Sequence, residues 1–336
     1  MMRGETLSEL MVEINKIAIK EDIEDLEKFR EDSTVVETNI HYPTNNTLMF
    51  DCISESNRLL KHLKKAVGRL KYNNYRKEGK KRCFKINVTD NKNERKELFQ
   101  EQLDLLTKSI NQVVSIIGME LERLGNVKVT GLLAALKSLL PVMNQVYKMT
   151  YDKEILGKQV PNNEKIFSIY ERHTDIIVKG QQECKFGHKV DIGTGASNLI
   201  LTCTISRGNP NDSKFFCHTI DTVKNKYGKP PKSAVTDGGF ASLANRNYAV
   251  KEGVKNVVFS KITKSMKNVV ESPFVENALI QWRSGIEAVI SNLKRGYKLV
   301  RCTWKGWEHF QRKVYWSIIA YNIRVMTGHM LRQMNV

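Results

Sequence analysis

The feature that most constrains the fold is a change of hydrophobic period along the chain. From about Leu48 to Met149 the apolar residues recur at spacings of three and four, which is typical of amphipathic helices. Segments rich in β-branched residues lie on both sides of this stretch, at residues 33–42 and again after residue 165. A strand, then a block of helices, then further strands predict an α/β protein with a helical insertion after its first strand.

The remaining elements follow from the same patterns. We expect a helix over residues 7–30, a first strand from Ser33, and a loop around residues 83–95 within the helical block. Pro141 should kink or end the helix that contains it. Later strands are expected at 166–171, 173–180, 187–195, 198–208, 233–238 and 256–261, and later helices at 212–228, 273–295 and 307–330.

This order predicts a mixed sheet flanked by helices and four segments of chain. Residues 1–44 would hold an N-terminal helix and the first catalytic strand, and residues 45–160 the helical insertion. Residues 161–300 would complete the catalytic domain, and residues 301–336 would form a C-terminal helical extension that buries Trp316 in its core.

The charge is strongly positive and unevenly distributed. The chain has 54 Lys and Arg against 36 Asp and Glu, a formal net charge of +18, yet residues 1–35 are acidic. The densest basic block, residues 57–83, includes Lys61, Lys64, Lys65 and Arg69, and a second basic zone at 294–313 contains two tryptophans. A solvated helix face is the simplest interpretation of any single block, but two such blocks favour contact with a nucleic-acid backbone.

Several classes of protein are not supported. The six cysteines form no CxxC pair, no two histidines have the HxxxH spacing, and neither a GxGxxG nor a GxxxxGK[ST] motif occurs. A run of 18 apolar residues and a signal-peptide pattern are also lacking. We therefore expect no membrane span and a cytoplasmic, nucleoid-associated protein.

Three acids stand out because each lies at the edge of a regular element. Asp32 precedes the first strand, Asp237 ends the strand SAVTDG before two glycines, and Glu287 lies on an amphipathic helix with Arg283 at i−4. Carboxylates that converge from different elements can hold two Mg²⁺ or Mn²⁺ ions for in-line displacement at phosphorus. Each acid could equally be a turn cap or a surface ion pair, and spacing alone does not select these three from 36.

At these residues the chain resembles bacterial insertion-sequence transposases, particularly the ISNCY-type group. EDSTVVETNIHYPT (31–44) is similar to the strand of the first aspartate, AVTDGGFAS (234–242) to that of the second, and RSGIEAVISNLKR (283–295) to the glutamate helix. IFSIYERHTDIIVKG, FGHKV and GNPNDS resemble the intervening segments, and RCTWKGWEHFQRKV resembles the segment after the glutamate helix. The resemblance covers nearly the whole chain, with its blocks in the right order.

The resemblance implies an RNase H-like fold, of the retroviral integrase type, with Asp32, Asp237 and Glu287 as catalytic metal ligands for Mg²⁺ or Mn²⁺. Arg283 and Lys294 match basic positions that contact DNA near the scissile phosphate, and Arg295 is added to this set. The partner implied is double-stranded DNA, both element ends and target, with a homo-oligomer as the active form. Glu171, Asp175 and Asp191 are rivals for the first acid.

Two departures accompany the resemblance. Some relatives carry a tyrosine three residues before the arginine, where this chain has Ile280. Relatives usually have an additional DNA-recognition region before the first aspartate, whereas here an acidic stretch of only 31 residues precedes Asp32. We therefore expect an N-terminally shortened copy or one part of an interrupted gene. The sequence predicts a transposase, with a catalytically inactive DNA-binding remnant and a nuclease without strand transfer as alternatives.

Overall fold

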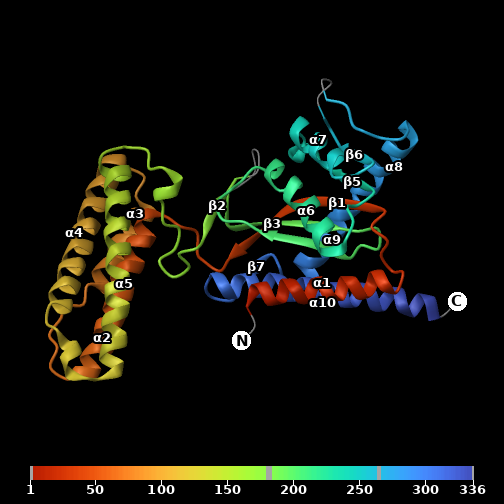
Figure 1. The fold of residues 1–336 in the computed structure, drawn as a ribbon. Helices are drawn as coiled ribbons and strands as arrows, with labels where there is room; N and C mark the ends of the chain where they lie inside the picture. The colour runs from red at the N-terminus through yellow and green to blue at the C-terminus, as the bar shows by residue number, and fades with distance from the viewer. Residues whose placement is uncertain (1–2, 179–183, 263–265, 335–336) are drawn as a thin grey trace. The chain divides into compact units, whose positions relative to one another are not determined.

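A computed structural model describes residues 3–178, 184–262 and 266–334 of the chain (Figure 1). The contacts between residues divide it into two compact units. One unit combines Met1–Asn39 with His173–Val336, and the other is the intervening segment Ile40–Arg172. The first unit is therefore discontinuous in sequence, because the second is inserted directly after its first strand.

A mixed sheet forms the centre of the first unit. Its strand order is β2-β3-β1-β5-β6, and β4 also pairs with β3 while β7 pairs with β1. β3 is antiparallel to β1, β2 and β4, whereas β5 runs parallel to both β1 and β6. The strands are β1 Lys28–Thr38, β2 Asp175–Ile177, β3 Lys185–Thr194, β4 Ile200–Ile205, β5 Ser233–Thr236, β6 Asn256–Phe259 and β7 Arg301–Cys302. This arrangement confirms the predicted α/β fold of the RNase H-like type.

Helices cover both faces of this sheet. On one face, Phe29 of β1 packs with Phe216 and Ile220 of α6 (Phe216–Tyr227). On the other face, Val36 of β1 and Ile192 of β3 share a core with α1, α9 and α10, and α1 and α10 lie side by side (Figure 1). The remaining helices of this unit are α1 Gly4–Lys20, α7 Leu243–Lys251, α8 Pro273–Arg283, α9 Gly285–Gly296 and α10 Trp307–Met334. Because both faces are covered, side chains on either face of β1 are largely shielded from solvent.

The inserted unit is a bundle of helices with its own core. Its main helices are α2 Asn45–Val67, α3 Arg76–Val88, α4 Lys92–Ile117 and α5 Val127–Thr150. Leucines from α2, α4 and α5 meet in one cluster, among them the fully buried Leu60, Leu106 and Leu136. The helical stretch 127–155 is long and apolar enough to cross a membrane by length and composition alone. Its buried residues belong to the bundle core, as in many core helices of soluble proteins.

The structure corrects several boundaries expected from the sequence. The first helix ends at Lys20, because Asp22 adopts a left-handed backbone, and β1 then begins at Lys28, so Asp32 lies within the strand rather than before it. No strand forms at 166–171, where the Ser168 hydroxyl accepts hydrogen bonds from two following backbone amides. The expected loop at 83–95 is mostly helix, with the break at residues 89–91.

Two further expectations about helices are corrected in part or in full. Of the two outcomes expected at Pro141, an end of the helix does not occur, because Pro141 lies within α5, where the buried Leu139, Val142 and Met143 hold both halves of the helix in the bundle core. Trp316 is 41% exposed, because α10 turns Val314 and Ile318 towards the sheet and leaves the tryptophan on its outer side.

Candidate active site

Asp32 and Asp237 come from two neighbouring parallel strands. Lys28, Phe29 and Arg30 of β1 pair in register with Ser233, Ala234 and Val235 of β5. The pairing ends at Arg30 and Val235, so Asp32 lies two residues further along β1, and Asp237 lies two residues further along the chain, immediately after the end of β5. The two aspartates therefore come from neighbouring parallel strands.

The backbone after β5 turns tightly around Asp237. The Asp237 Oδ1 atom accepts a hydrogen bond from the Gly239 amide at 2.8 Å and caps a short 3-10 helix, η5 Gly238–Phe240. A Cβ atom at Gly238 would lie 3.0 and 3.1 Å from the carbonyl oxygens of Lys261 and Ser260. Glycine at this position lets the turn pack closely on the chain that follows β6.

Glu287 lies on α9, and Arg283 connects it to Asp32. The Arg283 Nη1 atom is 4.0 Å from Asp32 Oδ2, and its Nη2 atom is 3.6 Å from Glu287 Oε1. The Glu287 side chain is 67% exposed, whereas those of Asp32 and Arg283 are mostly buried. The arginine thus neutralises two carboxylates that come from a strand and a helix.

A buried arginine that the sequence did not single out fixes the position of this helix. Arg30, two residues before Asp32 on the same face of β1, donates to the Trp282 carbonyl, and its guanidinium lies 4.3 Å from the centre of the Trp282 ring. A Cβ atom at Gly285 would overlap its Nη1 atom. Arg30 therefore occupies the point at which α8 ends and α9 begins, with Ser284 between them.

A second group of acids lies on the opposite face of β1. Glu31 and Asp191 are fully buried and share a hydrogen bond, and Thr219 of α6 donates to Glu31 at 2.8 Å. Burial raises the pKa of Glu31 to about 7, and burial together with the charge of Glu31 raises the pKa of Asp191 well above its usual range. Carboxyls this close share one proton, because two buried negative charges repel strongly.

Asp212 is an acid that the sequence analysis passed over. Its Oδ1 atom accepts from Ser33 Oγ at 2.8 Å and from Lys189 Nζ at 2.9 Å, and a Cβ atom at Gly239 would lie 3.3 Å from its Oδ2 atom. It therefore borders the loop after Asp237. Asp212 lies within GNPNDS, a segment that resembles the transposases, and this resemblance could have indicated that it is near the site.

The rivals for the first acid have different surroundings. Glu171 belongs to the inserted unit. Asp175 is held by His188, Arg207 and the Gly208 amide; burial alone would raise its pKa, but these hydrogen bonds lower it to about 2. Asp191 points to the α6 side, away from Asp32.

The expected DNA-binding residues are accessible in both units. Lys294 is partly exposed and Arg295 exposed at the end of α9, where Arg295 donates to Ser291 Oγ. In the inserted unit, Lys61, Lys64, Lys65 and Arg69 are all exposed along α2 and just beyond it. A hollow of about 350 Å³ beside them is lined by Arg58, Lys61, His62, Lys65 and Arg76 together with Tyr72 and Tyr170.

The acids fit divalent metal ions by their donor chemistry. Carboxylate oxygens are hard ligands that suit Mg²⁺ and Mn²⁺, and the strands that carry or precede Asp32 and Asp237 pair with each other. Within residues 3–178, 184–262 and 266–334, no three His, Cys, Asp or Glu side chains are grouped closely enough to form a complete metal site. The Arg283 guanidinium lies between Asp32 and Glu287, so a shared metal site would require Arg283 and the exposed Glu287 side chain to change rotamer.

Comparison with known proteins gives one match. The sequence profile described as the transposase DDE domain matches residues 170–323. No curated protein and no solved structure matches the chain. The matched segment includes Asp237 and Glu287, whereas Asp32 and nearly all of the inserted unit lie before it.

Proposed function

We propose that this chain, whose residues 170–323 match the transposase DDE domain, is a transposase that cleaves and joins DNA strands with Asp32, Asp237 and Glu287 as ligands of two divalent metal ions. The family match supports the enzyme class. The three ligands, the metal mechanism and strand transfer are the parts proposed here.

One observation carries the proposal. Arg283 joins Asp32 of β1 to Glu287 of α9, and β1 pairs in parallel with β5, which ends one residue before Asp237. This supports a site to which residues far apart in the sequence supply the carboxylates that metal-dependent phosphoryl transfer requires.

The residues would divide the chemistry between them. Two bound Mg²⁺ ions would activate the attacking water or 3′ hydroxyl and stabilise the leaving oxygen. Asp32 and Asp237 would hold the metals on rigid strands, and Glu287 would complete the set from the helix. Arg283 would bind a phosphate oxygen next to the scissile bond, and Lys294 and Arg295 would hold the DNA strand further along α9.

The basic surface of the inserted unit would bind the DNA backbone. Lys61, Lys64, Lys65 and Arg69 present their charges together, and salt-dependent affinity is the expected signature of such contacts. A homo-oligomer as the active form and a location on the nucleoid remain predictions, the first of which light scattering with and without element ends would test.

A plasmid-nicking assay tests the catalytic proposal. Wild type should nick supercoiled DNA with Mg²⁺ or Mn²⁺ and lose this activity with a chelator. Asp237→Asn and Glu287→Gln should lower the rate by at least about a hundredfold, because each removes a metal ligand. The matched control is Glu9→Gln, which removes an exposed acid on α1.

Each outcome discriminates between functions. Retained, salt-sensitive DNA binding without metal-dependent nicking would identify a DNA-binding remnant. Nicking without joining of a pre-cut element end to a target would identify a nuclease. Equal activity of wild type and Asp32→Asn would remove Asp32 from the proposed triad and make Asp212 the next acid to test.

A further inference from the structure

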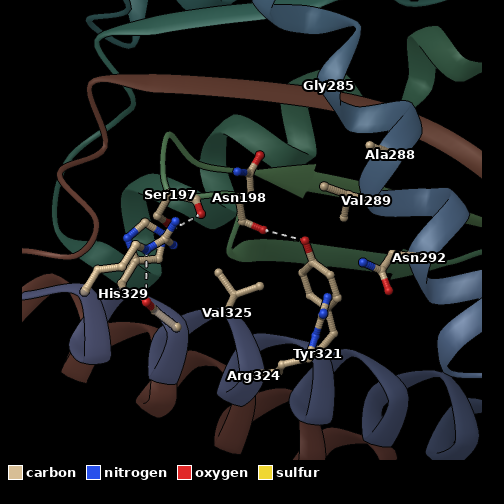
Figure 2. A pocket seen from close by; sticks show the side chains of 12 residues that line it. Ser197, Asn198, Gly285, Ala288, Val289, Asn292, Tyr321, Arg324, Val325 and His329 are labelled. Carbon is tan, nitrogen blue, oxygen red and sulfur yellow. Dashed lines mark hydrogen bonds between the residues drawn. The ribbon is translucent and has the colours of Figure 1, made fainter. Parts of the chain in front are cut away.

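A pocket lies between the glutamate helix and the last helix of the chain (Figure 2). Its volume is about 360 Å³, and it opens to solvent. α9 forms one wall, α10 forms the other, and the turn between β3 and β4 forms the floor with Ser197 and Asn198. Part of the α10 wall, from Arg324 to Arg332, lies beyond the end of the family match.

The polar groups of this pocket are suited to an anion. Arg324, His329 and Arg332 line it, and no Asp or Glu occurs among the described residues of its wall. Arg332 and Arg324 are exposed, and Arg324 stacks over the Tyr321 ring. His329 Nε2 lies 3.1 Å from the Ser197 carbonyl oxygen, which holds the ring against the floor (Figure 2).

A buried positive charge lies directly beneath the floor. Arg30 donates to the Asn198 side chain and to Thr194 Oγ1, and all its hydrogen-bond partners within the described residues are neutral. A guanidinium in a poorly solvated place creates a positive potential around it. The Glu24 carboxylate lies under the same turn but accepts the Ser197 and Ala196 amides, which reduces its own effect on the pocket.

The pocket uses the side of α9 that faces away from Glu287. Gly285, Val289 and Asn292, which line it, are spaced four and three residues apart and share one face. Glu287 and Lys294 are seven residues apart and share the opposite face. A ligand in the pocket would therefore contact the side of α9 opposite Glu287 and would not contact the catalytic residues.

We propose that this pocket is a second phosphate site, which binds a backbone phosphate of duplex DNA between Arg324, Arg332 and the Asn292 amide. The proposal rests on the proposed action of this chain on DNA, and it adds a contact separate from Arg283, Lys294 and the inserted unit. Inorganic phosphate has the same chemistry, so it serves as a competing probe.

The first test removes the charges. Arg324→Gln with Arg332→Gln should weaken binding of a fluorescein-labelled duplex severalfold and lower the slope of log affinity against log salt by up to about 2, since each phosphate contact contributes about 0.9. The matched control, Lys226→Gln with Lys251→Gln, removes two exposed charges from the same unit and should leave the slope unchanged.

The second test fills the pocket without changing charge. Ala288 lines the pocket and is exposed, so Ala288→Trp can occupy the space without disturbing the core, and Ala288→Ser is its control. The tryptophan variant should lose the same contact as the arginine variant, with thermal unfolding showing that it folds. Stabilisation of wild type by inorganic phosphate, absent in the arginine variant, without any change in DNA affinity would assign the pocket to free phosphate instead.

Unchanged affinity and salt slope in both variants would overturn the proposal. The result is separable from failure of the proposed catalysis, because Asp237→Asn removes a metal ligand and should retain the pocket's contribution to DNA binding. A pocket variant that binds less DNA while Asp237→Asn binds normally supports the site whether or not the chain nicks DNA.

Discussion

Three consecutive residues of β1 serve different parts of the molecule. Arg30 and Asp32 face α8 and α9, whereas Glu31 between them faces α6. Alternation along a strand usually separates a buried face from a solvated one, but here both faces are covered by helices. The sequence therefore indicated Asp32 through its motif but gave no reason to bury Arg30 or Glu31. Asp237 could be predicted from the neighbouring residues alone, because an acid and two glycines after a strand indicate a tight turn at the strand end.

The shared proton of Glu31 and Asp191 predicts a pH dependence of stability. The folded pKa of Glu31, about 7, exceeds the ordinary value of 4.5, so folding favours the protonated form. Stability should be greatest below the ordinary pKa and fall as the pH rises towards 7, by up to about 3 kcal/mol. Glu31→Gln should flatten this decrease, because the amide cannot ionise and can donate to Asp191.

Denaturant unfolding without metal, from about pH 5 to about pH 8, measures this effect. Glu9→Gln on the exposed side of α1 should retain the wild-type pH profile. An identical profile in wild type and Glu31→Gln would show that the buried pair is not the origin of the dependence.

Among the elements, the break between α8 and α9 has the largest effect on the site. The sequence predicted one helix over residues 273–295, because its apolar stripe continues through the break. The structure divides it at Ser284, next to Trp282, whose carbonyl accepts a hydrogen bond from Arg30. The break depends on a contact from a residue of β1, which the periodicity of the helix does not reveal. It could therefore not be predicted from the sequence.

Gly285→Ala tests the importance of this break. The added methyl group would overlap the Arg30 guanidinium, and relieving that overlap should move the start of α9 and with it Glu287. We expect a loss of stability of about 1–3 kcal/mol, as for other overpacked sites. Nicking should fall by about tenfold or more, since misplaced catalytic groups lower rates steeply.

The control is Gly131→Ala in α5, where an added methyl group meets no atom within 4 Å. That change should stabilise the protein by about 0.5–1 kcal/mol, because alanine favours helix more than glycine does, and leave nicking unaltered. Normal nicking by Gly285→Ala would show that α9 tolerates displacement at its start.

At the scale of the whole molecule, the inserted unit has the properties of an independent domain. Its core is contiguous and contains many fully buried leucines. Residues 40–172 expressed alone should therefore be helical and unfold cooperatively, as measured by circular dichroism during heating. Leu106→Ala should lower its stability by about 2–5 kcal/mol. A broad, non-cooperative transition would show that the bundle depends on the rest of the chain.

The charge of this unit gives a prediction for the complete protein. Replacing Lys61, Lys64, Lys65 and Arg69 with glutamine should reduce the salt slope of DNA binding by up to about 4, because each phosphate contact contributes about 0.9. Four glutamine replacements at Lys20, Lys28, Lys226 and Lys251, all exposed on the other unit, form the control. Equal slopes in the two variants would show that the basic block of the bundle is a solvated surface that does not contact DNA.

The long interval between β1 and its sheet partners has a consequence for synthesis on the ribosome. Arg30 and Thr194, which are joined by a hydrogen bond, are 164 residues apart, and the bundle lies between them. Helical contacts close over short stretches of chain and form quickly, whereas non-local strand pairing is slow. The nascent bundle can therefore fold before β1 has a partner strand. β1, the central strand of the sheet, stays unpaired until β3 and β5 have been translated. During that interval its exposed edge is open to aggregation, so slower translation after residue 172 would prolong the most vulnerable state of the chain.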